Sequence, residues 1–206
     1  MPQSPDKSPD KTYDRAYFDK WYRGRSRVNS ASEVRRKVTM ALAIAEYFLR
    51  RPVRSVLDVG CGEGAWFTHL RQLRPRATYL GIDPSDYVVE RFGESRNIRQ
   101  ASFGELASLG IEKTFDLIVC SDVLHYVEER EIVCGIAEIV RLLDGVAFLE
   151  VLTKEDDIVG DLDRLMRRPA SWYRRTFSSA GLVSVGPYAW IGPSLRDSAA
   201  ELERMG

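Results

Sequence analysis

The stretch Val56-Leu57-Asp58-Val59-Gly60-Cys61-Gly62-Glu63-Gly64 places an apolar run directly before three glycines that alternate with other residues. A strand that runs into such a turn, followed by a helix over residues 66–73, surrounds a ligand with backbone N–H groups and a helix N-terminus. Glycine suits the turn because a side chain would block the close approach of a ligand. The stretch therefore predicts a ligand-binding turn between a strand and a helix.

Beyond this turn, short β-rich runs alternate with amphipathic segments. A helical stripe, Ile132, Val133, Ile136, Ile139, Val140 and Leu143, would cover one face of a sheet. The alternation predicts an α/β fold: a single doubly wound, Rossmann-like domain with a mostly parallel central sheet flanked by helices. The predicted strands are Ser55–Val59, Thr78–Ile82, Asn97–Ala101, Phe115–Cys120 and Val146–Leu152.

The N-terminal part divides into a tail and a helical segment. Residues 1–12 repeat a Ser-Pro-Asp-Lys unit and are expected to be disordered. Residues 13–50 are expected to form helices that cap the domain as a lid, and residues 51–206 form the main domain. Ser30 and Glu33 make a capping-box signature for a helix that runs to Leu49. An aromatic face at helical spacing comes before it: Tyr13, Tyr17, Phe18, Trp21 and Tyr22.

The C-terminal part predicts further helices and one apolar pair. An acidic run, Glu155-Asp156-Asp157, is typical of a helix start, and a second helix is expected over Ser171–Ala180, ended by Gly181. Two apolar runs follow at Leu182–Val185 and Tyr188–Ile191. The tail Ser194–Met205 is expected to form a short helix with Leu195, Ala199 and Leu202 on one side.

Composition excludes several classes. Among 206 residues, 30 Lys and Arg balance 30 Asp and Glu, so no overall field favours nucleic acid or an anionic membrane. Three widely spaced cysteines favour neither a disulfide framework nor a metal site. No apolar stretch approaches the roughly 18 residues that span a bilayer, and no signal-peptide centre is present. We therefore expect a cytoplasmic protein. The residues leave open whether it acts as a monomer or homodimer.

Two features decide which ligand the turn binds. Gly60, Gly62 and Ala65 also fit the dinucleotide pattern, but Asp58 places a carboxylate that suits an ammonium and a sulfonium better than a pyrophosphate. The strand Phe115–Cys120 then leads into Ser121–Val127. From about Ser55 to Leu152, these segments resemble the class I (Rossmann-like) S-adenosylmethionine-dependent methyltransferases, especially the small-molecule type.

The resemblance implies a set of cofactor-binding residues. Asp83, followed by Pro84, would take the ribose hydroxyls. Ser121 and Asp122 would lie near the methionine end and the reacting sulfur. The family often has an acidic residue at the adenine, whereas this chain reads Gln100-Ala101-Ser102-Phe103. Ser102 and Phe103 are therefore the candidates there. The methionine part would be surrounded by Asp58, Gly60, Cys61 and Gly62.

The predicted activity is methyl transfer from S-adenosyl-L-methionine, leaving S-adenosyl-L-homocysteine, to an oxygen or nitrogen of a small molecule. His125, just past the fourth strand, is the candidate base, and packing at the site entrance is its alternative role. The Asp/Asn-Pro-Pro-aromatic run of glutamine and adenine methylases is absent, which favours a small acceptor over nucleic acid. A nicotinamide-dependent oxidoreductase and a non-catalytic cofactor-binding module stay open as alternatives. The candidate substrate residues, which core packing would equally explain, are Tyr17, Trp21, Tyr22, Tyr126, Trp172 and Tyr173.

Overall fold

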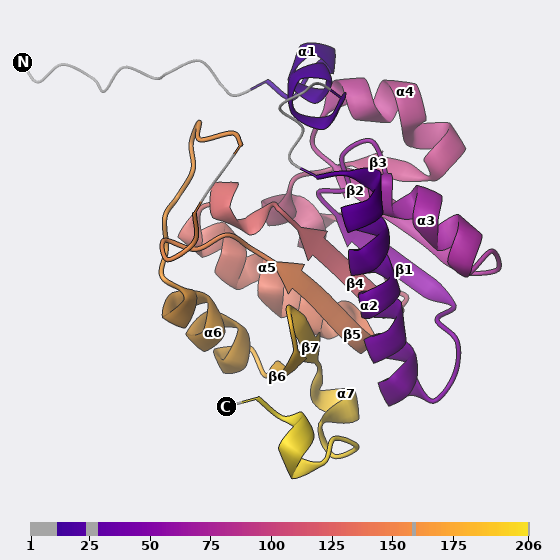
Figure 1. The fold of residues 1–206 in the computed structure, drawn as a ribbon, viewed down its shortest axis with the longest axis vertical. Coiled ribbons are helices and arrows are strands. Elements are labelled where there is room, and N and C mark those ends of the chain that lie inside the picture. Colours follow the sequence, from indigo (N-terminus) through magenta and orange to yellow (C-terminus); the bar gives the residue numbers. More distant parts are fainter. Residues whose placement is uncertain (1–11, 24–28, 158–159, 206) are drawn as a thin grey trace, which may run out of the picture.

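The computed structural model describes residues 12–23, 29–157 and 160–205. Its centre is one seven-stranded sheet in the order β3-β2-β1-β4-β5-β7-β6 (Figure 1). The strands from β3 to β5 in this order are parallel, β7 is antiparallel to β5, and β6 is antiparallel to β7. The strands are β1 (Ser55–Val59), β2 (Thr78–Asp83), β3 (Ile98–Gln100), β4 (Phe115–Ser121), β5 (Leu143–Glu150), β6 (Val183–Gly186) and β7 (Ala189–Ile191).

The order of the strands fixes where a ligand can bind. The chain moves from β1 outward to β3 and then returns to place β4 on the other side of β1. The loops after β1 and β4 therefore leave the sheet in opposite directions from adjacent strands, which opens a crevice at their carboxyl ends. The glycine turn lies in the first of these loops.

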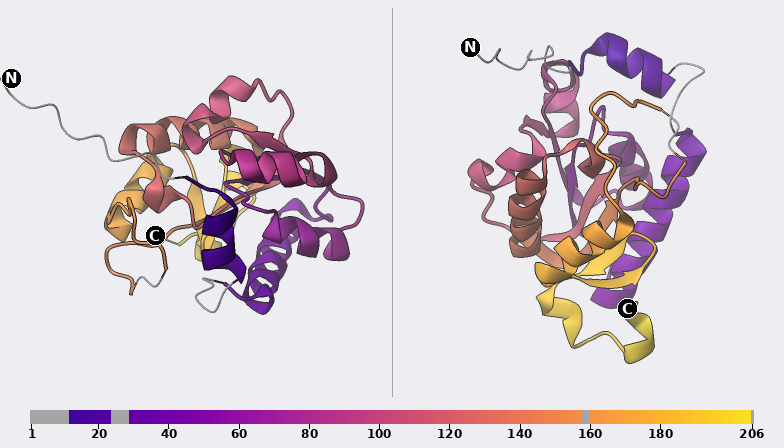
Figure 2. Two further views of the ribbon diagram at one scale, coloured as in Figure 1. Left: turned by 90° about the horizontal axis from the view of Figure 1, so that it is seen from above. Right: turned by 90° about the vertical axis from the view of Figure 1, so that its left-hand side faces the viewer.

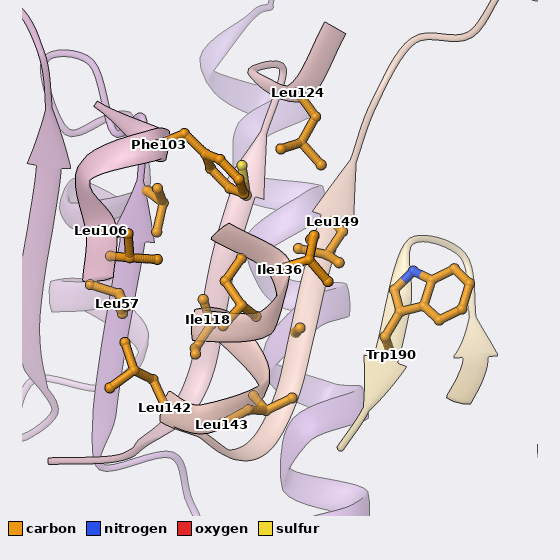
Figure 3. Packing of buried hydrophobic residues seen from close by; sticks show 14 of the residues in the cluster. Leu57, Phe103, Leu106, Ile118, Leu124, Ile136, Leu142, Leu143, Leu149 and Trp190 are labelled. Atoms are coloured by element: carbon orange, nitrogen blue, oxygen red, sulfur yellow. The ribbon is translucent and has the colours of Figure 1, made fainter. Parts of the chain in front are cut away.

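Helices cover both faces of the sheet. Side chains alternate along a strand, so Val56 packs toward α2 and α3, and Leu57 packs toward α5 and α6. Figure 3 shows this second layer, with Ile118 of β4 and Leu149 of β5 beside Ile136 of α5. The longer helices are α2 (Ala31–Leu49), α3 (Ala65–Leu73), α4 (Asp86–Arg96), α5 (Glu129–Leu142) and α6 (Ala170–Ser179).

Short helical pieces complete the fold. The first two of these pieces, which residues 15–23 form, lie beyond the carboxyl ends of the parallel strands. They are at the same end of the sheet as the segment between β5 and α6 (Figure 2). Among the described residues, no helix is both long and apolar enough to span a bilayer. The short pieces are α1 (Arg15–Phe18), the π-helical η1 (Asp19–Arg23), the 3₁₀ segments η2 (Phe103–Leu109), η3 (Leu124–Tyr126) and η4 (Glu201–Glu203), and α7 (Pro193–Arg196).

The structure confirms the predicted fold class and the five strands, whose ends differ by up to three residues. The predicted box at Ser30 is present: Glu33 N–H donates to the Ser30 hydroxyl at 3.2 Å, and Ser30 N–H donates to the Glu33 carboxylate at 2.6 Å. One residue of the predicted helical stripe was assigned wrongly. Leu143 begins β5 instead of ending the helix, because its backbone pairs with Phe115 of β4. The predicted disorder of residues 1–11 lies outside the described residues.

Two C-terminal predictions were also wrong. Glu155 starts no helix of its own, since its carboxylate accepts the N–H of Ala170 at 3.0 Å and so caps α6. The Asp156 carboxylate likewise accepts hydrogen bonds from the N–H and the hydroxyl of Thr153. The tail forms only α7 and η4, with Leu202 fully exposed. Met205 N–H instead donates to Ser184 of β6 at 2.8 Å, which keeps the end of the chain extended.

Candidate functional site

Two cavities meet at the glycine turn. The first cavity has a volume of about 280 Å³ and lies between the N-terminal helices and the ends of β1, β2 and β4. The second cavity has a volume of about 370 Å³ and lies between α2, α3 and the turn. Their linings share five residues, here called the junction: Tyr22, Gly60, Gly62, Ser121 and Asp122. An elongated ligand that fills both cavities must therefore pass the junction.

The glycine turn is held by its neighbour β2. Gly60 has a φ of +72°, and its N–H and that of Cys61 donate to Ile82 O at 2.7 and 3.0 Å. Gly62 N–H donates to the Asp83 carboxylate at 2.8 Å. The turn thus presents its backbone to both cavities while one carboxylate at the end of β2 fixes its conformation.

Asp83 lines the first cavity from beneath the turn. Its other oxygen accepts the N–H of Ser85 at 3.0 Å, and the residue is buried. Burial raises the pKa of Asp83 to about 6, although the N–H donors of Ser85 and Gly62 act in the opposite direction. Each carboxylate oxygen has a second lone pair, so Asp83 can accept further hydrogen bonds from hydroxyls in the cavity. Pro84 follows it in the lining.

Asp58 lies beneath the second cavity, together with Cys61. Because side chains alternate along β1, Asp58 shares the face of Val56, where it is 2% exposed and accepts the hydroxyl of Tyr79 at 2.7 Å. Burial raises the pKa of Asp58 to about 7, and the nearby Asp83 charge adds to this. A buried carboxylate of this kind favours a cationic group in the cavity above it.

The raised pKa of Asp58 predicts a pH-dependent stability. Between the unfolded pKa, about 3.9, and the folded value of about 7, the folded chain binds more protons than the unfolded chain. The contribution of Asp58 to the free energy of unfolding therefore falls as pH rises through this window, by roughly 4 kcal/mol. We expect Asp58→Asn to gain stability over wild type at pH 8 and little at pH 5, measured by urea denaturation. An equal gain at both pH values would contradict the assignment.

Four aromatic residues of the segment 13–22, here called the aromatic lid, lie over the turn: Tyr13, Tyr17, Phe18 and Tyr22. Helix α2, which was also expected in the lid, packs against a face of the sheet instead. The rings of the lid lie 5.0–6.3 Å apart in edge and tilted contacts, and all four line the first cavity. Arg23, at the end of η1, pairs with Glu63 of the turn. The lid is therefore tied to the turn by charge as well as by apolar contact. Trp21, also predicted at the site, is not among the residues that line either cavity.

Ser102 and Phe103 both line the first cavity. Ser102 begins η2 and bonds the Glu105 carboxylate through its N–H and its hydroxyl, at 2.8 Å each. Phe103 is 5% exposed and joins the core layer of Figure 3. Its ring fits against Gly135 of α5, where a Cβ would lie 2.2 Å from the ring.

Sequence reasoning missed a polar network beside the junction. Lys37 Nζ of α2 lies 2.7 Å from a Glu150 oxygen of β5 and donates to Asn29 at 3.2 Å. Ser121 also donates to Glu150, and Asn29 donates to Asp122 at 3.4 Å. Glu150 is 9% exposed and stands at the carboxyl end of its strand. An acidic residue ending an apolar strand was the available signal.

Besides Trp21, three predicted residues do not line either cavity. His125 is 1% exposed: its Nδ1 accepts Leu152 N–H at 3.3 Å, and its Nε2 lies 3.9 Å from Asp122. Trp172 packs under the guanidinium of Arg168. Tyr173 lies in a separate cavity of about 800 Å³ along β5, β7 and α6. Tyr126, by contrast, lines the first cavity.

One family model matches the central part of the chain. Residues 57–145 match the family model described as a methyltransferase domain. The match includes the glycine turn, Asp83 and the end of β4. The search against curated proteins yields no match.

Solved structures share this fold at low sequence identity. A SAM-dependent methyltransferase from Archaeoglobus fulgidus aligns with a TM-score of 0.60 and 14% identity over 80% of this chain and 72% of its own. The plantazolicin methyltransferase BamL, in complex with a desmethylPZN analogue and SAH, gives 0.59 and 15% over 72% and 62%. An O-methyltransferase family protein from Burkholderia thailandensis gives 0.53 and 17% over 84% and 62%. The chain thus spans about three fifths of the length of the last two proteins.

Proposed function

Since the chain carries a methyltransferase domain of the Rossmann-like fold, we propose that it transfers a methyl group from S-adenosylmethionine to an oxygen or nitrogen of a small molecule. The observation that carries the proposal is the pair of buried carboxylates, Asp58 and Asp83, on either side of a glycine turn between two joined cavities. The SAH bound to the plantazolicin methyltransferase, a protein of the same fold, supports it.

The proposed cofactor fits the cavities by charge and by hydrogen bonding. Asp83 would accept the ribose hydroxyls, and Ser102 and Phe103 would contact the adenine in the first cavity. Asp58 would face the amino group of the methionine part in the second cavity. When bound, S-adenosylmethionine supplies an electrophilic methyl group on a sulfonium, which joins its two halves and so belongs at the junction. The aromatic lid would exclude water there.

Titration calorimetry tests the proposal. S-adenosylhomocysteine should bind the purified chain at micromolar concentration or below, and NAD should bind at least 100-fold more weakly. Binding of NAD alone would replace the proposal with an oxidoreductase. Tight binding of S-adenosylhomocysteine without methyl transfer to any compound of a broad acceptor panel would favour a non-catalytic module.

Replacing Asp83 should weaken binding of S-adenosylhomocysteine by about one to two orders of magnitude. The expected loss is roughly 1.5–3 kcal/mol, because Asp83→Ala removes a charged acceptor for the ribose hydroxyls. It also frees the Gly62 N–H that Asp83 holds at 2.8 Å. Asp86→Ala, on the exposed first turn of α4, is the control and should leave the affinity unchanged. Unchanged affinity in a folded Asp83→Ala protein would refute the ribose assignment.

We propose that His125 acts as a positioning residue behind Asp122 and not as the base. Its Nδ1 is occupied by Leu152 N–H, and its Nε2 faces Asp122. His125→Gln should therefore lower kcat less than tenfold, leave the affinity for S-adenosylhomocysteine unchanged and keep the shape of the pH–rate profile. A general base would contribute a factor of about 10²–10⁴ to kcat. A loss of that size, with disappearance of a limb near pH 6–7, would restore the role as base.

A further inference from the structure

The junction of the two cavities carries a single charged side chain among its five residues. Asp122 is that residue, and Tyr22 supplies the one aromatic ring. The described lining of the first cavity adds two carboxylates, Asp83 and Glu131, and includes no lysine, arginine or histidine. The described lining of the second cavity adds the cations Lys37 and Arg96 beside Asp58 and Glu63, so the anionic and aromatic character belongs to the junction and to the first cavity.

Asp122 is held at the junction by its backbone and its neighbours. It follows β4 with a φ of +66°, a left-handed conformation that aspartate tolerates better than most residues. Asn29 donates to one oxygen at 3.4 Å, and His125 lies 3.9 Å from the other. Lys37, the nearest ammonium to this group in the polar network, is paired with Glu150. The charge of Asp122 therefore remains available to a ligand.

Further tyrosines line the first cavity on one side of the junction. Tyr17 and Tyr22 come from the lid, and Tyr126 comes from the segment after β4. Burial, followed by the charges of Asp161 and Asp122, raises the pKa of Tyr126. The ring consequently stays neutral, with its electron-rich face intact. Aromatic faces combined with a carboxylate are the surroundings that bind organic cations.

The charge of the transferred group distinguishes nitrogen from oxygen as acceptor. With a neutral amine, the positive charge leaves sulfur and arrives on nitrogen, so the carboxylate and the rings stabilise it before, during and after the transfer. With an oxyanion, the positive charge disappears during the transfer. Asp122 would then stabilise the ground state more than the transition state and slow the reaction.

Resting on the proposed function, we infer that the methyl acceptor is the nitrogen of a small aliphatic amine, bound at the junction by Asp122 and the surrounding aromatic rings. The amine arrives as an ammonium ion and passes one proton through the Asp122 carboxylate to solvent before the transfer, so that Asp122 is ionised again when the methyl group moves. The nitrogen lone pair then forms the new N–C bond while the C–S bond breaks and its electron pair stays on sulfur. The products are an N-methylammonium ion and a neutral thioether.

One probe that carries both kinds of acceptor tests the atom directly. Tyramine has a phenol and an aliphatic amine, and the fragmentation of its methylated product by mass spectrometry locates the methyl group. N-methyltyramine is the expected product. O-methyltyramine would overturn the inference.

A binding experiment tests the same inference without turnover. Choline and 3,3-dimethylbutan-1-ol have the same shape and differ in charge, so their affinities for the protein saturated with S-adenosylhomocysteine report cation recognition. Choline should bind at least tenfold more tightly. Equal affinities would overturn the amine acceptor, whereas failure of S-adenosylhomocysteine itself to bind would overturn the proposed function.

Variants of junction residues test whether the preference for choline over 3,3-dimethylbutan-1-ol arises at the junction. Asp122→Asn should reduce the preference for choline to within about threefold, and Asp144→Asn should preserve it, because Asp144 is half exposed at the opposite end of β5. If circular dichroism shows that Asp122→Asn fails to fold, Tyr22→Phe and Tyr22→Leu replace it. The phenylalanine variant should keep the preference and the leucine variant should lose most of it. Retention in Asp122→Asn, or in Tyr22→Leu, would refute the assignment.

Discussion

Replacing Gly60 with alanine should lower the affinity for S-adenosylhomocysteine at least 100-fold, which is about 2.7 kcal/mol. Gly60 has a φ of +72°, and a Cβ there would lie 2.3 Å from Cγ2 of Val123 and within 3.3 Å of two more of its carbons. Valine is stiff about its first side-chain torsion, so relief requires movement of the segment after β4. Asp122 lies in that segment. The substitution would therefore disturb the turn and the junction together.

Gly110 offers a matched control for this experiment. It has a φ of +60°, yet a Cβ there would meet nothing within 4 Å. Gly110→Ala carries the same left-handed strain, about 1–2 kcal/mol, but no collision. We expect it to lower stability and to leave the affinity unchanged, as measured by calorimetry and thermal denaturation. If the two variants bound S-adenosylhomocysteine equally well, the turn would not be a wall of the cofactor site.

Replacing Asp116 with alanine should lower the free energy of unfolding by about 3 kcal/mol, because a buried charge network loses its centre. Asp116 is the second residue of β4, and its side chain is 6% exposed. Arg51 donates to both its oxygens at 2.7 Å, and Arg54 N–H donates at 2.6 Å. Burial opposes ionisation of Asp116, but these donors outweigh it and hold its pKa below the ordinary value. The melting temperature should fall by about 8 °C.

Asp144 provides the comparison for Asp116. It lies 3.6 Å from the same Arg51 but is half exposed, and exposed pairs contribute about 0–1 kcal/mol. Asp144→Ala should therefore shift the melting temperature by no more than about 2 °C, followed by circular dichroism. Equal losses in the two variants would mean that burial of Asp116 does not set the size of the effect. Both positions lie at the end of the sheet opposite the cavities, so binding of S-adenosylhomocysteine should persist.

The sequence could predict the sheet because local signals agreed with the global fold. The runs that became β1 and β4 carry apolar residues on both faces, as a central parallel strand requires, and the capping box at Ser30 begins α2 as expected. The C-terminal part was harder because its partners are distant in sequence. Hydrogen bonds between separate elements, and not local propensity, determine the structure there. The Glu155 carboxylate caps α6 fifteen residues away, and Met205 N–H donates to β6.

The site was predictable where it follows the strand ends and less so where it depends on distant segments. Asp58, Asp83 and the residues after β4 reach the cavities because their strands end there. Spacing could not reveal that Lys37 meets Glu150, since α2 and β5 are adjacent only in the folded chain. Aromatic character alone could not separate Tyr126, which lines a cavity, from Trp172, which packs under an arginine.

The contact between Phe103 and Gly135 links the floor of the first cavity to the interior of the protein. The ring fills a volume that helix α5 leaves open by having no side chain at position 135. With the adenine placed as proposed, we expect Phe103→Ala to extend the cavity toward α5 and to admit purine analogues with an additional substituent. The same contact constrains evolution: in related chains the residues at these two positions should vary together, a larger one at 135 with a smaller one at 103.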